Sequence, residues 1–367
     1  MVKGRRGGGG QSHALHTRKA IIKMISQTAK QKPRGAFCLG QREFDWIYGP
    51  DERRDIAELV MLPDGLYTPE FLKKNRDALA ETEVILSGWG GPRIDEHFLA
   101  AAPSLKLVLY GAGSLSGIAT YSAWERGVRF CSAAYANSIP VAEYSLAAIL
   151  LGLKHVWHHA TAIKGQKRWT DHYPPPGAYH SVVGLASLGL IARILIDKLK
   201  SFDLRVIAYD PFVSPEEARE LGVELVSLRD LFTRSDAISV HTPLLQETRG
   251  MITGELLSLM KKGATLINTS RGAVINEVEL LDIAAQRPDL QFVLDVTDPE
   301  PPIPGSRIFD LPNVILTPHI AGSMDRECQR MGRLMVDELR RYLAGEPLRH
   351  EITAKIASHS IHRPVAV

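Results

Sequence analysis

The segment from Ser181 to Asp210 constrains the fold more than any other part of the chain. Its sequence, SVVGLASLGLIARILIDKLKSFDLRVIAYD, predicts a buried strand at Val182–Ser187, a helix at Leu188–Ser201 and a second strand at Leu204–Tyr209. The second strand ends in an acidic residue, Asp210. A strand–helix–strand unit of about 30 residues that ends in an acid is typical of a dinucleotide-binding site.

The turn between this strand and this helix matches the glycine fingerprint G-x-G-x-x-G/A only in part. The three small residues of the fingerprint fall on Ser187, Gly189 and Ala192. Gly189 is the position at which the backbone approaches a pyrophosphate, and Ala192 is small enough for the helix to pack closely on the strand. Ser187 departs from the pattern. The turn alone therefore leaves two interpretations open, an ordinary βαβ unit or a dinucleotide site at Ser187, Leu188, Gly189, Leu190 and Ile191.

Length and composition indicate a globular protein with two domains. The chain has 367 residues, of which 45% are hydrophobic and 23% are charged. No apolar run approaches the roughly 20 residues of a membrane span, so no membrane partner is expected. The three cysteines, Cys38, Cys131 and Cys328, are widely spaced and odd in number. This argues against a disulfide framework or a zinc site, and it favours a reducing compartment such as the cytoplasm.

The positive charge of the chain is concentrated in residues 1–34. This segment contains nine Lys or Arg and no acidic residue, and the rest of the chain has 35 basic and 41 acidic residues, a net charge of −6. We expect a disordered basic leader. A transit peptide, a segment that binds an anionic surface, and a natural start at Met24 remain alternatives. Because the remaining chain is acidic, nucleic-acid binding is not expected.

Alternating strand and helix patterns predict two doubly wound parallel sheets, an α/β fold. Seven strands between Val182 and Thr317 form the larger sheet. The smaller sheet has four short strands, predicted at Ala57–Leu62, Glu83–Ser87, Leu105–Tyr110 and Val128–Cys131. Ser138–Ile163 predicts one long helix with Pro140 in its first turn, and its apolar residues cover more than one face.

Glycine-rich loops follow two strands of the smaller sheet. In a parallel sheet such loops face the ligand crevice, where bare backbone N–H groups can hold a carboxylate or carbonyl oxygen. Simple turns remain the alternative. The candidate substrate-binding residues in these loops are Gly90, Gly91, Gly113 and Ser114.

Three strand ends of the larger sheet carry polar residues that a plain fold does not require. They are Asn268–Gly272, Asp295–Pro301 and Thr317–Gly322, and they lie at the same sheet edge as the opening turn. Arg271, Glu300 and His319 would therefore meet in one crevice.

These three residues suit hydride transfer at a carbon that bears oxygen. Histidine exchanges the proton of that oxygen, and a carboxylate on its other ring nitrogen fixes the tautomer. Arginine can hold a substrate carboxylate with two hydrogen bonds. Each residue alone also has a structural alternative. A further group, His155, His158 and His159, has no acidic or thiol partner nearby in the sequence, so we predict no metal site.

From about Leu105 to Glu351 the chain resembles the D-isomer-specific 2-hydroxyacid dehydrogenases. The resemblance is specific at TRGMI (Thr248–Ile252), LINTSRGAVIN (Leu266–Asn276), LDVTDPEP (Leu294–Pro301) and LPNVILTPHIAG (Leu311–Gly322). It implies that NAD is the cofactor and that a small 2-keto acid and a D-2-hydroxy acid are interconverted. It also implies a homodimer formed through Pro140–Ile163.

The resemblance assigns roles to individual residues. It implies that Arg271 binds the substrate carboxylate, that Glu300 supports the histidine and that His319 is the acid/base and also touches substrate and cofactor. It further implies that Asp210 takes the ribose hydroxyls and that Asp295 faces the nicotinamide amide. The other cofactor contacts that it implies are Pro211, His241, Thr242, Pro243, Thr248, Thr269, Ser270, Arg271 and Gly322.

The resemblance also implies a division into domains. Residues 140–322 would form a Rossmann NAD-binding domain. Residues 35–139 and 323–352 would form a smaller, flavodoxin-like substrate domain, and 353–367 would be a tail. Pro211 and Phe212 follow Asp210 with no adjacent arginine, which favours NAD over NADP because a carboxylate repels a 2′-phosphate.

Three departures from the family pattern and two alternative functions stay open. Ser187 and Leu190 stand where the family has glycine and arginine, and Thr297 stands where an aromatic residue is common. A formate-dehydrogenase-like activity is disfavoured because that group has glutamine in place of Glu300. The alternative from another class is a non-catalytic NAD(H)-sensing interaction protein, like the corepressors that share this fold.

Overall fold

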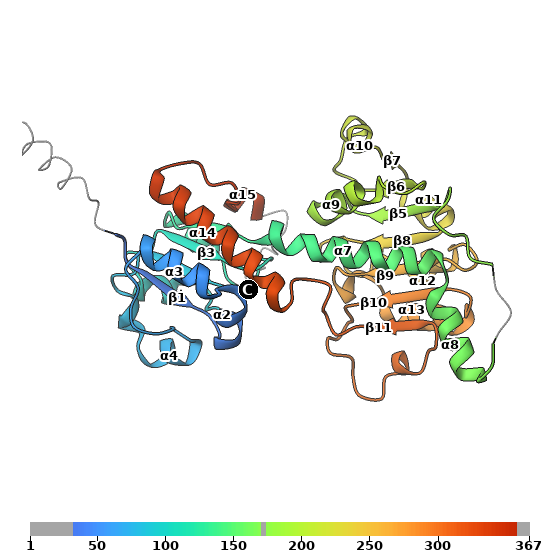
Figure 1. The fold of residues 1–367 in the computed structure, drawn as a ribbon, viewed down its shortest axis with the longest axis horizontal. Helices are drawn as coiled ribbons and strands as arrows, with labels where there is room; N and C mark the ends of the chain where they lie inside the picture. Colours follow the sequence, from blue (N-terminus) through green and yellow to red (C-terminus); the bar gives the residue numbers. More distant parts are fainter. Residues whose placement is uncertain (1–31, 170–173, 358–367) are drawn as a thin grey trace, which may run out of the picture.

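The computed structural model describes residues 32–169 and 174–357. The expected disordered leader therefore lies almost wholly outside the described residues, as do the last ten residues of the predicted tail. At the first described residues, Arg34 forms a parallel bridge with Met61. The chain forms two lobes, each built around one parallel sheet (Figure 1). The α/β prediction of two doubly wound parallel sheets is confirmed.

The first lobe contains the four-stranded sheet, in the order β1-β2-β3-β4. Its apolar strands are buried on both faces, as parallel strands covered by helices require. The strands are β1 (Gly35–Cys38), β2 (Val84–Ser87), β3 (Leu107–Tyr110) and β4 (Arg129–Ser132). One face packs on α2 (Gln41–Ile47), α3 (Pro50–Leu59) and α14 (Cys328–Ala344). The other packs on α4 (Pro69–Lys74), η1 (Arg76–Leu79), α5 (Glu96–Ala101) and α6 (Tyr121–Glu125).

The predicted strand at Ala57–Leu62 is wrong. Residues up to Leu59 belong to α3, which starts with Pro50 in its first turn and two acids beside it, both favourable at a helix N-terminus. The first strand of the sheet is instead β1, Gly35–Cys38, and Met61 forms only a single parallel bridge, to Arg34 beside it. A short apolar run cannot be distinguished from part of a helix by periodicity alone, which explains the error.

The second lobe contains the seven-stranded sheet, in the order β11-β10-β9-β8-β5-β6-β7. All neighbouring strands are parallel, and the seven predicted strands are confirmed. The strands are β5 (Val182–Ala186), β6 (Arg205–Tyr209), β7 (Glu224–Leu225), β8 (Ala237–Val240), β9 (Thr265–Asn268), β10 (Gln291–Leu294) and β11 (Val314–Leu316). The strand order reverses between β5 and β8, and ligands of such sheets bind at the carboxyl ends of the strands at this point.

Helices cover both faces of the larger sheet, as two separate buried clusters show. They include α9 (Leu190–Leu199), α10 (Pro215–Leu221), α11 (Leu228–Arg234), α12 (Gly254–Ser258) and α13 (Glu277–Gln286). Short 3-10 turns occur at η2 (Gly272–Val274), η3 (Arg307–Phe309) and η4 (Asp325–Glu327), and α15 (Ala354–Ala357) ends the described chain.

The prediction of one long helix at Ser138–Ile163 is wrong. Two helices, α7 (Ala134–Leu153) and α8 (Val156–Gln166), are separated at His155, whose φ is +49°. Pro140 accordingly lies inside α7 and not in its first turn. Near the break α7 approaches the sheet closely, because a Cβ on Gly152 would lie 2.8 Å from Thr265 Oγ1.

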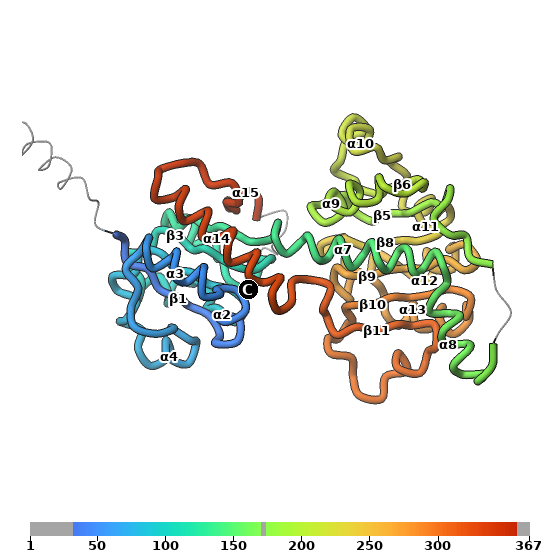
Figure 2. Tube along the Cα trace, viewed as in Figure 1, coloured from blue at the N-terminus to red at the C-terminus, as the bar shows by residue number. Residues whose placement is uncertain are grey.

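Helix α7 runs from the first lobe into the second, across the predicted domain boundary at 139/140 (Figures 1 and 2). The domain boundaries themselves stay a prediction. Among the described residues, α7 is the one helix long and apolar enough to span a membrane by length and composition, and 56% of that stretch is buried inside the protein. Such burial is also what a core helix shows.

Candidate functional site

The turn after β5 offers free backbone donors at the switch point of the larger sheet. Gly189 is the N-cap of α9, and no side chain caps this helix. A Cβ on Gly189 would meet no atom within 4 Å apart from its chain neighbours, and Gly189 and Leu190 are exposed, so the turn is open at this point. Uncapped N–H groups that face open space suit a phosphate, and this is where the pyrophosphate of a dinucleotide would fit.

Ser187 occupies the left-handed conformation that the fingerprint reserves for glycine, with φ of +75°. Two hydrogen bonds hold it there. Its N–H donates to Tyr209 O at 2.8 Å, and its hydroxyl donates to Thr242 Oγ1 at 3.1 Å. Serine at this position is therefore strained, and its bonds to residues at the end of β6 and just after β8 hold it in the strained conformation.

Asp210 lies beside this turn, at the end of β6. Its Oδ2 accepts a hydrogen bond from Leu188 N at 2.8 Å, and its Oδ1 accepts one from Phe212 N at 2.9 Å. A carboxylate has about four acceptor positions, so each oxygen keeps capacity for a ribose hydroxyl. The Asp210 carboxylate thus helps to hold the turn on which the cofactor would lie, and Pro211 is the next residue of the chain.

The segment after β8 lies opposite Ser187. His241 is buried, and burial lowers its pKa to about 4, so the ring is neutral. Its Nε2 lies 3.0 Å from Ser239 Oγ, and its Nδ1 has no hydrogen-bond partner among the described residues. Thr248 closes the loop by donating to Pro243 O at 2.6 Å. The unpaired Nδ1 makes His241 a candidate polar contact for a ligand.

The loop after β9 carries Arg271. It is braced by buried Asn268, whose Oδ1 accepts bonds from Ser270 N at 3.0 Å and Ser270 Oγ at 2.8 Å. The Arg271 side chain is exposed, and its Nη1 donates to Ser270 O at 2.6 Å. Thr269 Oγ1 lies 3.4 Å from Ser145 Oγ of α7.

This loop packs backbone to backbone against the loop after β10. A Cβ on Gly272 would lie 2.6 Å from Thr297 Cα and even closer to the Thr297 carbonyl group. The loops that carry Arg271 and Glu300 are therefore in direct contact. No hydrogen bond or ion pair joins Arg271 to Glu300 or His319 within residues 32–169 and 174–357.

Glu300 and His319 form the one direct pair among the three candidate catalytic residues. His319 Nδ1 lies 2.6 Å from Glu300 Oε1, and the side chains are 47% and 41% exposed. The backbone of His319 is left-handed, with φ of +55°. A non-glycine residue in this conformation persists only where its surroundings hold it, and such positions cluster at functional sites.

Asp295 holds the loop on which His319 lies. It is 2% exposed. Its Oδ1 accepts bonds from Thr317 Oγ1 at 2.6 Å and Ile320 N at 2.8 Å, and its Oδ2 accepts one from Ala321 N at 2.9 Å. Its carbonyl accepts from His319 N at 2.9 Å. Contact of this carboxylate with a nicotinamide amide stays a prediction, and its bonds to the loop are a feature that the sequence did not indicate.

Asn137 of α7 brings a loop of the first lobe next to the His319 loop. Its Oδ1 accepts a hydrogen bond from Ser323 N at 2.9 Å. A Cβ on Gly113 would lie 3.4 Å from Asn137 Nδ2, and one on Gly322 would lie 3.2 Å from Asn137 Oδ1. Sequence reasoning missed Asn137, because a hydrogen bond between residues 186 positions apart leaves no local pattern.

The other candidate substrate residues lie on the same edge of the smaller sheet. Gly90 is left-handed, with φ of +71°, and a Cβ on Gly91 would lie 2.9 Å from Gly88 O. Ser114 donates its hydroxyl to Ser116 Oγ at 3.0 Å. Since β2 and β3 are neighbours, the two loops form one glycine-lined rim that ends at Asn137.

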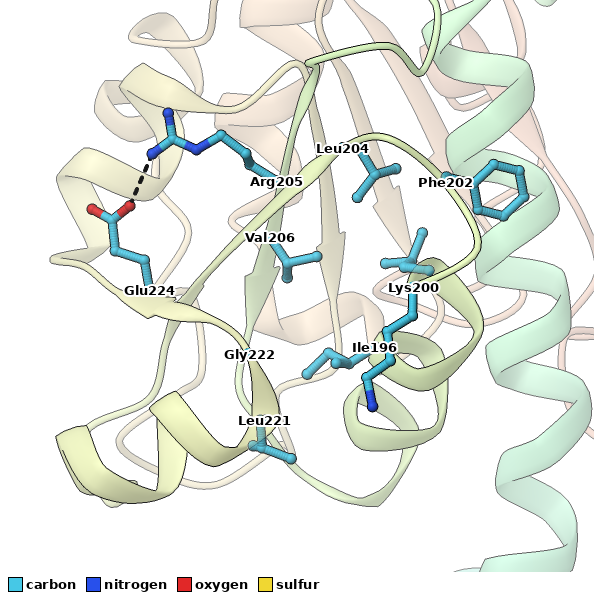
Figure 3. Close-up of a pocket in the computed structure, with 10 residues that line it drawn as sticks. Ile196, Lys200, Phe202, Leu204, Arg205, Val206, Leu221, Gly222 and Glu224 are labelled. Carbon is cyan, nitrogen blue, oxygen red and sulfur yellow. Dashed lines mark hydrogen bonds and ion pairs between the residues drawn. The ribbon is translucent and has the colours of Figure 1, made fainter.

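Two other features are separate from these residues. In the part of the chain that the structure describes, no group of three or more His, Cys, Asp or Glu side chains is placed to hold a metal ion. A cavity of about 400 Å³ lies at the amino end of β6, opposite the turn, where α9 ends. Arg205 and Glu224 form an ion pair of 3.3 Å at its wall (Figure 3).

Comparisons with known proteins are consistent with a dinucleotide site. Residues 146–321 match the family described as D-isomer specific 2-hydroxyacid dehydrogenase, NAD binding domain. The D-3-phosphoglycerate dehydrogenase of Mycobacterium leprae is 31% identical over 306 residues, which are 83% of this chain and 54% of that protein. The enzyme of the same name from Methanocaldococcus jannaschii is 30% identical over 288 residues, 78% of this chain and 54% of that protein. The chain spans about half the length of these relatives.

Solved structures share the whole architecture. The TT0316 protein from Thermus thermophilus has a TM-score of 0.67 at 26% identity, with 87% of this chain and 100% of that chain covered. A phosphoglycerate oxidoreductase from Rhizobium etli has a TM-score of 0.75 at 21% identity, with 89% and 100% covered. The D-mandelate dehydrogenase of Rhodotorula graminis has a TM-score of 0.72 at 23% identity, with 88% and 97% covered. The latter two likenesses concern the fold alone.

Proposed function

The chain belongs to the D-isomer specific 2-hydroxyacid dehydrogenases, and we propose that it is an NAD-dependent enzyme that interconverts a 2-keto acid and a D-2-hydroxy acid. The observation that carries the proposal is the His319–Glu300 pair, with 2.6 Å between Nδ1 and Oε1. It lies at the same sheet edge as the uncapped N-terminus of α9. A proton-exchanging group and a dinucleotide site thus share one edge.

The proposed division of labour follows from the chemistry of these residues. When bound, NAD(H) accepts or supplies the hydride. Glu300 holds the Nδ1–H of His319, so Nε2 is the nitrogen that gives a proton to the keto oxygen or takes one from the hydroxyl. Arg271 binds the substrate carboxylate, for which its planar guanidinium is suited. The side chains of all three residues are exposed, so a substrate can reach them.

Residues of the turn and of β6 would hold the cofactor. The free N–H groups at the start of α9 suit the pyrophosphate, and Asp210 suits the ribose hydroxyls. Because a carboxylate at this position repels a 2′-phosphate, we infer a preference for NAD over NADP. The buried Nδ1 of His241, without a protein partner among the described residues, supports a ligand beside β8.

A homodimer through the Pro140–Ile163 region remains a proposal. The supporting observation is that α8 has no buried residue and that Leu151 and Val156 are 42% and 37% exposed. The cytoplasm also remains a proposal, supported by three buried free cysteines. Light scattering of the purified protein tests the first of these, and a monomer mass would contradict it.

A screen of NADH oxidation over 2-keto acids tests the proposed function. The panel runs from glyoxylate and pyruvate through hydroxypyruvate, and the 2-keto acid formed by oxidation of 3-phosphoglycerate at C2, to branched and aromatic 2-keto acids. We expect turnover with at least one of them and formation of the D-hydroxy acid. Tight NADH binding with no turnover across the panel would instead favour the non-catalytic sensor, for which the His319–Glu300 pair is not needed.

A further inference from the structure

The loop that carries His319, residues 317–323, needs support from outside itself. His319 has a left-handed backbone, a strained conformation for a non-glycine residue that persists only where its surroundings hold it. Asp295 supports the middle of the loop through Ile320 N and Ala321 N. The two ends of the loop are held by another element, the interlobe helix α7.

Tyr144 of α7 holds the beginning of the loop. Its hydroxyl lies 2.8 Å from Thr317 Oγ1, and Thr317 donates its only hydroxyl hydrogen to Asp295 Oδ1 at 2.6 Å. The hydrogen in the first bond must therefore come from Tyr144. Burial raises the pKa of Tyr144, so it remains a donor at neutral pH. A directed chain runs from Tyr144 through Thr317 to Asp295.

Asn137 of α7 holds the end of the loop. Its Oδ1 accepts from Ser323 N at 2.9 Å. Asn137 and Tyr144 are seven residues apart, a spacing that returns to the same helix face within about 20°. One face of α7 therefore forms hydrogen bonds with both ends of the segment on which His319 lies.

Helix α7 also contacts the loop of Arg271, from a neighbouring face. Ser145, next to Tyr144, lies 3.4 Å from Thr269, two residues before Arg271. Because α7 begins in the first lobe beside Gly113 and ends in the second, it ties both catalytic loops to the rim of the first lobe (Figure 2). A rigid helix is better suited to this task than a loop would be.

We propose that Asn137 and Tyr144 are positioning residues, which hold the 317–323 loop so that the His319 ring is aligned with the reacting carbon. The inference rests on the proposed function for its catalytic meaning. Neither side chain needs to touch substrate. Each acts through a backbone or hydroxyl group of the loop, and the loss of one bond lets His319 sample unproductive orientations.

Kinetics of Tyr144→Phe, Asn137→Ala and Asn137→Asp test the proposal. Tyr144→Phe removes one oxygen, and Asn137→Asp keeps an acceptor for Ser323 N. We expect kcat to fall about tenfold in the first two variants, because small misplacement of a catalytic group is costly, with KM and the Kd for NADH within about threefold of wild type. Asn137→Asp should recover most of kcat. The control, Glu143→Gln, breaks an exposed ion pair with Lys198 on another face of α7 and should leave kcat unchanged.

A second measurement does not depend on turnover. The ring resonances of His319, assigned by their loss in His319→Gln, should shift or broaden in Tyr144→Phe and Asn137→Ala and remain unchanged in Glu143→Gln. Unchanged kcat and unchanged His319 resonances in Tyr144→Phe and Asn137→Ala would overturn the proposal, even if both variants were less stable. If wild type turns over no keto acid, the proposed function fails, and the resonances alone decide whether α7 positions His319.

Discussion

Gly272 is where the loops of Arg271 and Glu300 touch, and Gly272→Ala probes that contact directly. A Cβ there would lie 2.6 Å from Thr297 Cα and closer still to the Thr297 carbonyl. An ordinary contact begins near 3.4 Å. The neighbour is backbone, which cannot rotate away as a side chain can. The two loops must therefore separate by at least about 1 Å for the alanine to fit.

This separation has two expected consequences. Overpacking of this kind costs about 1–3 kcal/mol of stability. A displacement of roughly 1 Å between groups that act on one substrate lowers the rate about 100-fold. We expect kcat/KM to fall by about that factor and the unfolding temperature to drop by several degrees. The Kd for NADH should change less than kcat/KM, because the turn after β5, which would hold the pyrophosphate, is untouched.

Gly165→Ala is the matched control for this experiment. Gly165 lies in α8, and a Cβ there would meet no atom within 4 Å. Alanine is the better helix former, so stability should hold or rise by up to about 1 kcal/mol, with normal kinetics. A Gly272→Ala enzyme with wild-type kcat/KM and wild-type unfolding temperature would refute the packing of the two loops.

Three further predictions concern the cofactor side. Ser187→Gly removes a left-handed strain of about 1–2 kcal/mol. It also loses the hydrogen bond to Thr242 and raises the conformational entropy of the unfolded chain, and each of these effects costs about 1 kcal/mol. The free energy of unfolding in urea should therefore change by no more than about 1 kcal/mol. Ser187→Ala keeps the strain and loses the bond, so it should be destabilised by about 1 kcal/mol, and equal stability would contradict this account. The pKa of His241 in the folded protein is about 4, below its ordinary 6.5, so the stability it contributes is present above that ordinary value and is lost as the pH falls towards 4. His241→Gln should lose less thermal stability than wild type between about pH 7 and about pH 4.5, and parallel losses would argue against a buried neutral ring. Asp210→Asn should reduce the ratio of kcat/KM for NADH over NADPH at least about tenfold, and a wild-type preference for NADPH would overturn the NAD assignment.

Most of the larger sheet is predictable from the sequence because its strands are buried on both faces. Such strands read as short apolar runs bounded by turn residues, as at Leu266–Asn268 and Phe292–Leu294. The smaller sheet was harder. Gly35–Cys38 is a strand of four residues with no alternation, and its partner β2 lies far along the chain. Ala57–Leu62 has the composition of a strand, yet half of it completes a helix.

The break between α7 and α8 had no local signal. The residues around Lys154 and His155 include no proline, and the only nearby glycine, Gly152, is inside α7. The break lies just after the point where α7 packs against β9 at Gly152, and none of the residues of α8 is buried. Tertiary contacts of this kind override local propensity.

The candidate site was partly predictable for a geometric reason. Residues that follow parallel strands share one sheet edge, and this places Glu300 and His319 in the same region from sequence alone. What supports them was not predictable. The bonds from Asp295 to the His319 loop, and from Asn137 and Tyr144 across to it, connect residues distant in sequence. Their roles, like those of Arg271, Glu300 and His319, remain predictions.

The measurement that tests the central claim most directly is kcat/KM of His319→Ala on the best keto acid, with the Kd for NADH measured on the same sample. Loss of a general acid lowers the rate about 100-fold to 10,000-fold, and we predict a loss in this range with the Kd within about threefold of wild type. His180→Ala, an exposed histidine at the opposite edge of the sheet, should behave as wild type. Turnover by His319→Ala at the wild-type rate would contradict the account.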